Sequence, residues 1–435
     1  MAYVPVDAVE VRAWGESVGA VALDPASGYY AFEYFPEWAD RGVQLAPGRM
    51  PTGAGPFVFP LLSTDTFHRL PAMLADALPD DFGNALIDAW LATHGVPREQ
   101  VTPLDRLAYM ASRGMGALEF APSRGPRHRK PSAVEMSALV EGARSLIDGE
   151  FGDDRETKAA IQGLIQVGTS AGGARAKAVI AWNRHTGEIR SGQLPADPGF
   201  EYWLIKLDGL GRDSELGTSA EHGRVEYAYF LMAQAAGIRM MESTLLKENG
   251  RAHFMTRRFD REDDGTKVHS LTLCGLSHLD FRQRATHDYA QLFLAADEVG
   301  LGAEARGEIF RRMIFNVLAN NNDDHTKNHS FLLAGASAAW QLSPAYDVTF
   351  AYNPRGEWTY QHLMSTNGKF SAASTDDFLA VADRHKVPGA RAAIATVRDA
   401  VASWSQFAAT AGLSSADAEL IRSTLPVDGS VGRRD

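Results

Sequence analysis

Three polar residues in the C-terminal third of the chain have the types and the spacing that phosphoryl transfer requires. Asp323 stands five residues before Asn328, and Asp347 follows after two short apolar runs. In a kinase catalytic loop, one carboxylate accepts the proton of the attacking hydroxyl, and an asparagine and a second aspartate hold Mg²⁺ on the nucleotide. The spacing selects Asp323 over Asp324, which is only four residues before Asn328. The pattern therefore predicts Asp323 as the base and the other two as metal ligands.

The same loop carries two basic side chains, and two other interpretations of it stay open. Lys327 is expected near the transferring phosphate, where it would stabilise negative charge, and His325 is expected to fix the loop by hydrogen bonding. One alternative is a polar turn in which Asp and Asn side chains cap backbone groups. The other is a metal-hydrolase site, because Asp323, Asp324, His325 and His329 are metal-ligand types, although no companion cluster at ligand spacing supports it.

The elements around the loop are predicted to bring its parts together. Residues 308–318 carry apolar side chains at helical spacing, so we expect a buried helix immediately before the loop. Residues 331–333 and 340–342 resemble the two strands of a hairpin. Such a hairpin would return Asp347 to the neighbourhood of Asn328.

A glycine-rich segment upstream is a candidate phosphate loop. Its small residues allow backbone N–H groups to approach phosphates closely, and Arg175 and Lys177 add positive charge. It is not a Walker motif, because Ala174 stands where that motif requires lysine. A simple glycine-rich turn is the alternative. The residues predicted to bind nucleotide here are Thr169, Ser170, Ala171, Gly172 and Gly173.

A lysine within an apolar strand is the next candidate. Lys206 interrupts the apolar run of residues 202–207, and a buried ammonium needs a partner. Nucleotide phosphates are one such partner, and Glu226 on a predicted helix over residues 222–236 is another. The alternative is an edge strand with Lys206 directed at water.

The order of these pieces strengthens the prediction. Residues 253–259 are expected to form a connecting strand whose backbone can pair with the edge of adenine, although a purely structural strand has the same composition. The glycine-rich loop, strand lysine, helix glutamate, connecting strand, catalytic loop and metal aspartate then follow one another as in a protein kinase. A chance match of the whole order is less expected than a match of any single piece.

The remaining regions are predicted from periodicity. Residues 8–13, 18–23 and 29–34 are expected to form strands. Residues 67–94, interrupted at 79–83, and 104–111 are expected to be helical, and so is most of the chain after residue 289. The basic segment from Arg124 to Lys130 is either a solvated linker or an arm that contacts phosphate or a partner.

Composition limits the class of protein. The 435 residues are 45% hydrophobic and 22% charged, as in an ordinary globular protein. The net charge of −11 argues against sequence-independent nucleic-acid binding, which needs a basic surface. Cys274 is the single cysteine, which excludes an internal disulfide and fits a reducing cytosol. The sequence shows no signal peptide and no apolar run long enough for a membrane span, so we expect a cytoplasmic location without membrane contact.

These motifs resemble the HipA family of serine/threonine kinases, the toxin half of type II toxin–antitoxin pairs. The resemblance implies an α+β, bilobed, protein-kinase-like fold with a small N-terminal subdomain and a mainly helical C-lobe. The expected boundaries are residues 1–125 for the subdomain, 126–262 for the kinase N-lobe and 263–435 for the C-lobe. The matching stretches are residues 169–177, 203–206, 258–261, 322–328 and 344–348, with 32–38 and 74–80 in the N-terminal part.

The resemblance also implies roles for individual residues. It implies that Ser170 is an autophosphorylation site whose phosphate would block ATP binding. It places the backbone of residues 257–259 against adenine, and Arg257 there departs from a family acid. The implied residues are Asp323 and Lys327 in catalysis, Asn328 and Asp347 on Mg²⁺, Lys206, Arg257, Phe259 and His325 on ATP, and Glu226 in a structural ion pair.

The resemblance implies partners that composition does not reveal. Family targets are translation components such as an aminoacyl-tRNA synthetase, and the antitoxin is a small HipB-like helix-turn-helix protein. Operator DNA would be contacted only through the antitoxin complex. Two other functions stay open: a catalytically silent kinase-fold partner of a DNA-binding repressor, and a small-molecule kinase.

Overall fold

The computed structural model describes residues 3–125, 136, 139–140, 142–143, 176–193, 196–208 and 221–425. The chain forms two compact units. The first unit contains residues 1–211, 255–271 and 332–339, and the second contains residues 212–254, 272–331 and 340–435. Helices and strands are mixed along the chain. The three-part division expected from the sequence stays a prediction.

A four-stranded sheet near the N-terminus belongs to the first unit. Its order is β3-β2-β1-β4, and its paired strands are antiparallel. Burial alternates along β1, as expected for a sheet with one face in the core. The strands are β1 (Ala8–Ala13), β2 (Glu16–Leu23), β3 (Tyr30–Tyr34) and β4 (Leu118–Ala121). The first three confirm the sequence prediction, whereas β4 is too short for its alternation to be recognised.

The first half of the expected helical stretch over residues 67–94 contains only one short helix before the expected interruption at 79–83, so that half of the prediction was wrong. His68 and Arg69 adopt left-handed φ angles of 52° and 64°, and Pro71 follows at the next helix start, so a continuous helix cannot form. The helices of this region are α1 (Pro36–Ala39), α2 (Thr64–Phe67), α3 (Ala72–Asp76), α4 (Asp81–Ala92) and α5 (Pro103–Met110).

The first unit also contains strands that carry the predicted nucleotide lysine. β5 (Lys177–Trp182) pairs antiparallel with both β6 (Ile189–Ser191) and β7 (Glu201–Lys206). The other neighbour of β7 is β9 (Arg251–Arg257), whose residues 255–257 belong to this unit. β7 is therefore an interior strand, and the edge-strand alternative for Lys206 was wrong.

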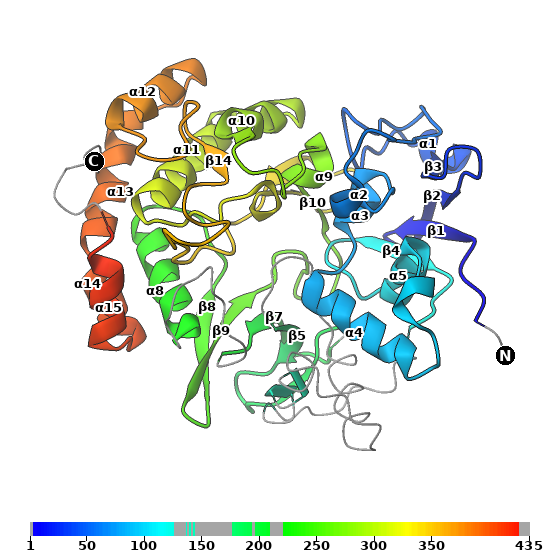
Figure 1. The fold of residues 1–435 in the computed structure, drawn as a ribbon, viewed down its shortest axis with the longest axis horizontal. Helices are drawn as coiled ribbons and strands as arrows, with labels where there is room; N and C mark the ends of the chain where they lie inside the picture. The colour runs from blue at the N-terminus through cyan, green and yellow to red at the C-terminus, as the bar shows by residue number, and fades with distance from the viewer. Residues whose placement is uncertain are drawn as a thin grey trace. The chain divides into compact units, whose positions relative to one another are not determined.

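The second unit is mainly helical. α11 (Ala303–Leu318) packs against α10 (Tyr289–Glu298) and α13 (Ala390–Ala402), while α8 (His222–Ala235) packs against α13 and α14 (Trp404–Ala411) (Figure 1). The predicted stripe of α11 is fully buried at Ile309, Phe310, Met313 and Ile314. No helix in the described part of the chain has the length and apolar character that crossing a membrane needs.

The remaining short elements belong to both units: residues 269–271 and 332–333 lie in the first unit and the others in the second. The predicted hairpin strands are neighbours in a sheet, and Ser343 N donates to Ser330 O at 2.9 Å. The remaining elements are β8 (Ser243–Glu248), β10 (His269–Thr272), α9 (Leu273–Ser277), β11 (His287–Asp288), β12 (Ser330–Leu333), β13 (Trp340–Leu342), β14 (Met364–Ser365), α12 (Thr375–Arg384) and α15 (Ser415–Arg422).

Candidate functional site

The polar loop that follows α11 is fixed by its own asparagines. Asn320 Nδ2 donates to the carbonyl oxygen of Thr424 at 2.9 Å, and Asn322 Nδ2 donates to that of Thr359 at 3.0 Å. Asn321 Nδ2 donates to the side-chain oxygen of Asn316 on α11 at 2.9 Å. The polar-turn interpretation is thus correct for these residues, because their amides satisfy buried polar groups.

Asp324 is a structural aspartate, a role that the sequence did not reveal. Its side chain is fully buried. One carboxylate oxygen accepts hydrogen bonds from Tyr289 Oη at 2.8 Å and His362 Nδ1 at 3.1 Å. The other accepts from the backbone N–H groups of Leu363 at 2.8 Å and Met364 at 3.2 Å. These four donors attach the loop to α10 and to the start of β14.

Asp323, the predicted base, has the opposite environment. Its side chain is 44% exposed, and the Nε2 of His325 lies 3.8 Å from its Oδ1. Its backbone oxygen accepts a hydrogen bond from Asn328 Nδ2 at 2.6 Å. Because the amide nitrogen of Asn328 is used in this way, its Oδ1 is the atom left for a hard metal ion.

The segment that contains Asp347 lies against the same loop. Tyr346, its chain neighbour, donates a hydrogen bond from its hydroxyl to the carbonyl oxygen of Lys327 at 2.6 Å. Asp347 itself adopts a left-handed φ of 52°. Tyr346, which precedes Asp347, therefore contacts Lys327, which precedes Asn328, as the predicted hairpin requires.

The metal-hydrolase interpretation fits the loop poorly. Asp324, one of its four ligands, already accepts four hydrogen bonds. The described residues contain no group of three His, Cys, Asp or Glu side chains that could hold a metal ion.

Two buried lysines lie opposite each other in the first unit. Lys206 at the end of β7 is 8% exposed. The residue opposite it on β5 is Lys177, which is 4% exposed. Directly opposed residues project on the same face of a sheet. Lys177 Nζ lies 3.9 Å from Asp80 Oδ2, at the N-cap of α4. Lys177 thus has a carboxylate nearby, and the sequence alone did not reveal the register that places it opposite Lys206.

Other predicted site residues are not brought together by the described structure. Glu226 on α8 is 2% exposed and belongs to the second unit, whereas Lys206 belongs to the first, so their ion pair stays a prediction. The phosphate-loop residues lie outside the described residues, namely Thr169, Ser170, Ala171, Gly172 and Gly173.

Comparison with protein-family models gives a match in the N-terminal region and another in the C-terminal region of the chain. A family model described as the HipA-like C-terminal domain matches residues 169–423, and the HipA N-terminal domain matches residues 9–121. This chain belongs to the HipA family. No match was found among curated proteins.

Two solved structures were compared with this HipA-family chain. The Shewanella oneidensis MR-1 HipA, solved in a complex with HipB and operator DNA, aligns with a TM-score of 0.66 at 15% identity, covering 95% of this chain and 94% of that one. The Helicobacter pylori proinflammatory kinase CtkA aligns with a TM-score of 0.34 at 14% identity, covering 53% of this chain and 89% of that one. The first alignment shows that the fold is that of HipA over nearly the whole length.

The Arg-Phe-Asp-Arg motif of this HipA-family chain is a buried ion cluster. Asp260 is fully buried between Arg258 Nη2 at 2.8 Å and Arg261 Nη1 at 2.7 Å, and it accepts the N–H of Gly116 at 2.8 Å. Burial acts to raise the pKa of Asp260, but the two arginine charges outweigh it and hold this pKa below its usual range. Arg261 also donates to Gly114 O at 3.1 Å, so the motif joins residues 258–261 to the end of the N-terminal domain.

The neighbouring residues assigned to adenine have other visible contacts. The Arg257 guanidinium forms an ion pair with Asp263, and Phe259 is partly exposed. Adenine contact by the backbone of this segment stays a prediction.

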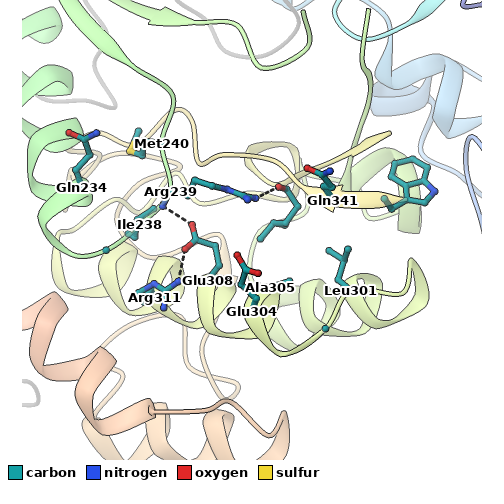
Figure 2. A pocket seen from close by; sticks show the side chains of 14 residues that line it. Gln234, Ile238, Arg239, Met240, Leu301, Glu304, Ala305, Glu308, Arg311 and Gln341 are labelled. Carbon is teal, nitrogen blue, oxygen red and sulfur yellow. Dashed lines mark hydrogen bonds and ion pairs between the residues drawn. The ribbon is translucent and has the colours of Figure 1, made fainter. Parts of the chain in front are cut away.

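A separate pocket of about 690 Å³ lies in the second unit (Figure 2). It is lined by the end of α8, the first turns of α11 and β13. Glu308 accepts hydrogen bonds there from Arg239 N at 3.0 Å and Arg311 Nη2 at 2.9 Å (Figure 2). Its lining includes none of the predicted site residues, so the pocket is a feature distinct from the loop.

Proposed function

We propose that this HipA-family chain is an ATP- and Mg²⁺-dependent protein serine/threonine kinase. The observation that supports it is the loop after α11, where Asp324 is buried and hydrogen-bonded while Asp323 stays accessible. Two hydrogen bonds support proximity of the predicted base and metal ligands: Asn328 donates to the backbone oxygen of Asp323, and Tyr346, next to Asp347, donates to that of Lys327. Phosphoryl transfer needs such residues close together.

The roles follow from the donor atoms. Asp323 would accept the proton of the attacking hydroxyl, and Lys327 would stabilise charge on the transferring phosphate. Asn328 and Asp347 offer an amide oxygen and a carboxylate, hard ligands that suit Mg²⁺. When bound, the metal supplies neutralising charge to the nucleotide phosphates.

The nucleotide would lie against the phosphate loop and the lysine pair. Lys206 would bind its phosphates, and Lys177 joins it because the two are opposed in the sheet. His325 stays in the predicted nucleotide set, and the backbone of residues 257–259 would contact adenine. The backbone N–H groups of residues 169–173 would approach the phosphates.

Ser170 would be the regulatory site of this kinase. A phosphoserine there carries roughly −1.5 to −2 charges and would occupy a loop built for ATP phosphates. Autophosphorylation would therefore block nucleotide binding and switch the enzyme off.

The biological role that we propose is that of a growth-arresting toxin. Its target would be a translation component such as an aminoacyl-tRNA synthetase, and its location cytoplasmic. A HipB-like helix-turn-helix antitoxin would neutralise it and carry it to operator DNA. With a net charge of −11, the chain itself is unsuited to bind DNA through a general electrostatic attraction.

The decisive experiment is an Asp323→Ala variant assayed with radiolabelled ATP and cell extract. We expect phosphate transfer and growth arrest to fall at least about a thousandfold, because the general base is removed from the transition state. The matched control is Asp297→Ala, whose side chain is 41% exposed compared with 44% for Asp323. Persistence of both activities in Asp323→Ala would refute the kinase assignment.

A second experiment tests the switch and the partner. Ser170→Ala should abolish self-labelling while leaving transfer to the extract, as mass spectrometry of the labelled chain would show. Self-labelling that continues with Ser170 absent would contradict the switch.

Co-purification with the product of the adjacent reading frame, followed by operator DNA binding, tests the antitoxin.

A further inference from the structure

We propose that Phe281 is a positioning residue whose aromatic ring holds the ammonium group of Lys327 beside the catalytic loop. This inference rests on the proposed kinase function and adds a residue to its site. Phe281 is partly exposed and lies between α9 and β11. Lys327 Nζ lies 4.9 Å from the centroid of its ring, within the distance of a cation–π interaction.

An aromatic ring suits this task better than a carboxylate. A carboxylate would hold the ammonium by neutralising its charge, and less of that charge would then act on a phosphate. The face of a phenyl ring attracts a cation through its quadrupole but has no net charge. Lys327 can thus be restrained while its full positive charge stays available for the transferring phosphate.

The ring belongs to a segment that is attached to the loop at several points. His325 packs against Phe281 at a centroid distance of 5.2 Å and an interplanar angle of 63°. Thr326 Oγ1 donates to the carbonyl oxygen of Leu279 at 2.8 Å. The position of Phe281 relative to the loop is therefore set by contacts other than the one with Lys327, as a positioning residue requires.

Restraint of Lys327 has a kinetic consequence. A lysine side chain has four rotatable bonds and loses considerable rotamer freedom when it is ordered. If part of that ordering exists before the nucleotide binds, less of it has to occur in the transition state. Removal of the ring should then reduce kcat and leave the KM for ATP largely unchanged.

The first test is a series of substitutions in the full chain, assayed by steady-state phosphate transfer. We expect Phe281→Leu to lower kcat about 3- to 30-fold, while Phe281→Tyr and Phe281→Trp remain near wild type because they keep an aromatic face. Phe407→Leu, at a partly exposed phenylalanine on α14, is the matched control. Tyr and Trp variants as impaired as Leu would overturn the proposal.

The second test separates the ring's electrostatics from its shape. Pentafluorophenylalanine at position 281 keeps an aromatic side chain but reverses the quadrupole, so it should reduce kcat as Leu does. In a Lys327→Met background, the Leu substitution should cause no further loss of kcat. A fluorinated variant with wild-type kcat, or a full loss in the Met background, would show that Phe281 acts through packing, through His325 or through Arg282, whose guanidinium lies 5.4 Å from the ring centroid.

A third measurement does not depend on activity. The ε-methylene protons of Lys327 should resonate upfield of other lysines because of the ring current, and this shift should vanish in Phe281→Leu. Phosphate transfer with an unshifted Lys327 signal would overturn the positioning role alone. A shifted signal in a wild-type protein without any phosphate transfer would instead refute the proposed function and, with it, the catalytic part of this inference.

Discussion

Asp260 and Asp324 are both buried aspartates, but their partners differ. Asp260, in the first unit, lies between two arginines. Asp324, in the second unit, is held by a tyrosine, a histidine and two backbone N–H groups. One carboxylate is thus more than compensated by formal positive charge, while the other is stabilised through hydrogen bonds.

The difference in partners agrees with the structural role of the first region and the proposed catalytic role of the second. Arg258, Asp260 and Arg261 join distant segments of one unit, and a net positive cluster is acceptable there. Asp324 adjoins Asp323 and lies in the loop of the proposed metal ligands. Hydrogen bonds fix the loop without an arginine, so the negative charge of Asp324 would add to the local potential that attracts the proposed divalent cation.

The largest effect is expected from Asp260→Ala. This change leaves the guanidinium groups of Arg258 and Arg261 buried without their carboxylate, and breaking a buried ion pair in this way costs about 3–5 kcal/mol. Denaturant unfolding measures it. The matched control is Asp263→Ala, because Asp263 is 86% exposed and its surface pair with Arg257 is worth about 0–1 kcal/mol. Similar losses in the two variants would contradict the difference in role.

The stability from Asp260 should also depend on pH. Its pKa is lowered in the folded state, so its contribution is present above the unfolded pKa of about 3.9 and is lost as pH falls through the folded value. The free-energy difference between wild type and Asp260→Asn should therefore shrink in acid. Unfolding midpoints measured between about pH 2 and 6 would test this, and a difference independent of pH would contradict it.

An intermediate effect is expected from Asp324→Asn. An asparagine cannot accept from all four donors, so unfolding free energy should fall by about 1–3 kcal/mol. Loss of the negative charge should also raise the Mg²⁺ concentration needed for half-maximal phosphate transfer. The control is Asp377→Asn, since Asp377 caps α12 in the same unit. The control variant should lose stability but need the same Mg²⁺ concentration as wild type. If both variants need more Mg²⁺, the effect is not specific to Asp324.

The smallest effect is expected from Tyr289→Phe. Its hydroxyl donates to the carboxylate of Asp324 and accepts from Asn316 Nδ2 at 2.8 Å, so the change removes two hydrogen bonds. We expect a loss of about 1–3 kcal/mol, near the lower limit, with kcat reduced severalfold. Tyr34→Phe, which loses a buried bond to Met50 O, should match it in stability but leave kcat unchanged. An unchanged kcat in both would show that the loop tolerates the loss.

The comparison of these aspartates also shows what the sequence could predict. The stripe of α11, the hairpin after the loop and the spacing from Asp323 to Asn328 are local patterns, and the structure contains the predicted elements. The roles of the site residues stay predictions. The partners of Asp324 lie 35 to 40 residues away in the chain, and Gly116 lies 144 residues from Asp260. Contacts between residues so far apart in the chain leave no periodic pattern in the sequence, so they could not be predicted from it.

A similar limit applies to the lysines. Lys206 was noticeable because it interrupts an apolar strand, but Lys177 opposes it only through the register of β5 and β7. Register depends on side-chain packing and on turns between strands, which no local pattern of the two strands contains.

The backbone of Asp347 has a consequence for how the protein can change over generations. Its left-handed φ of 52° costs an ordinary side chain about 1–2 kcal/mol, and glycine or asparagine accepts this conformation most readily. A single-nucleotide change converts an aspartate codon to either residue. We therefore expect Asp347→Gly to relieve this backbone cost, which offsets part of the stability lost with the side chain, while it loses phosphate transfer, as calorimetry and a kinase assay would show. In a lineage relieved of selection for activity, the backbone at this position would then favour replacement of the aspartate.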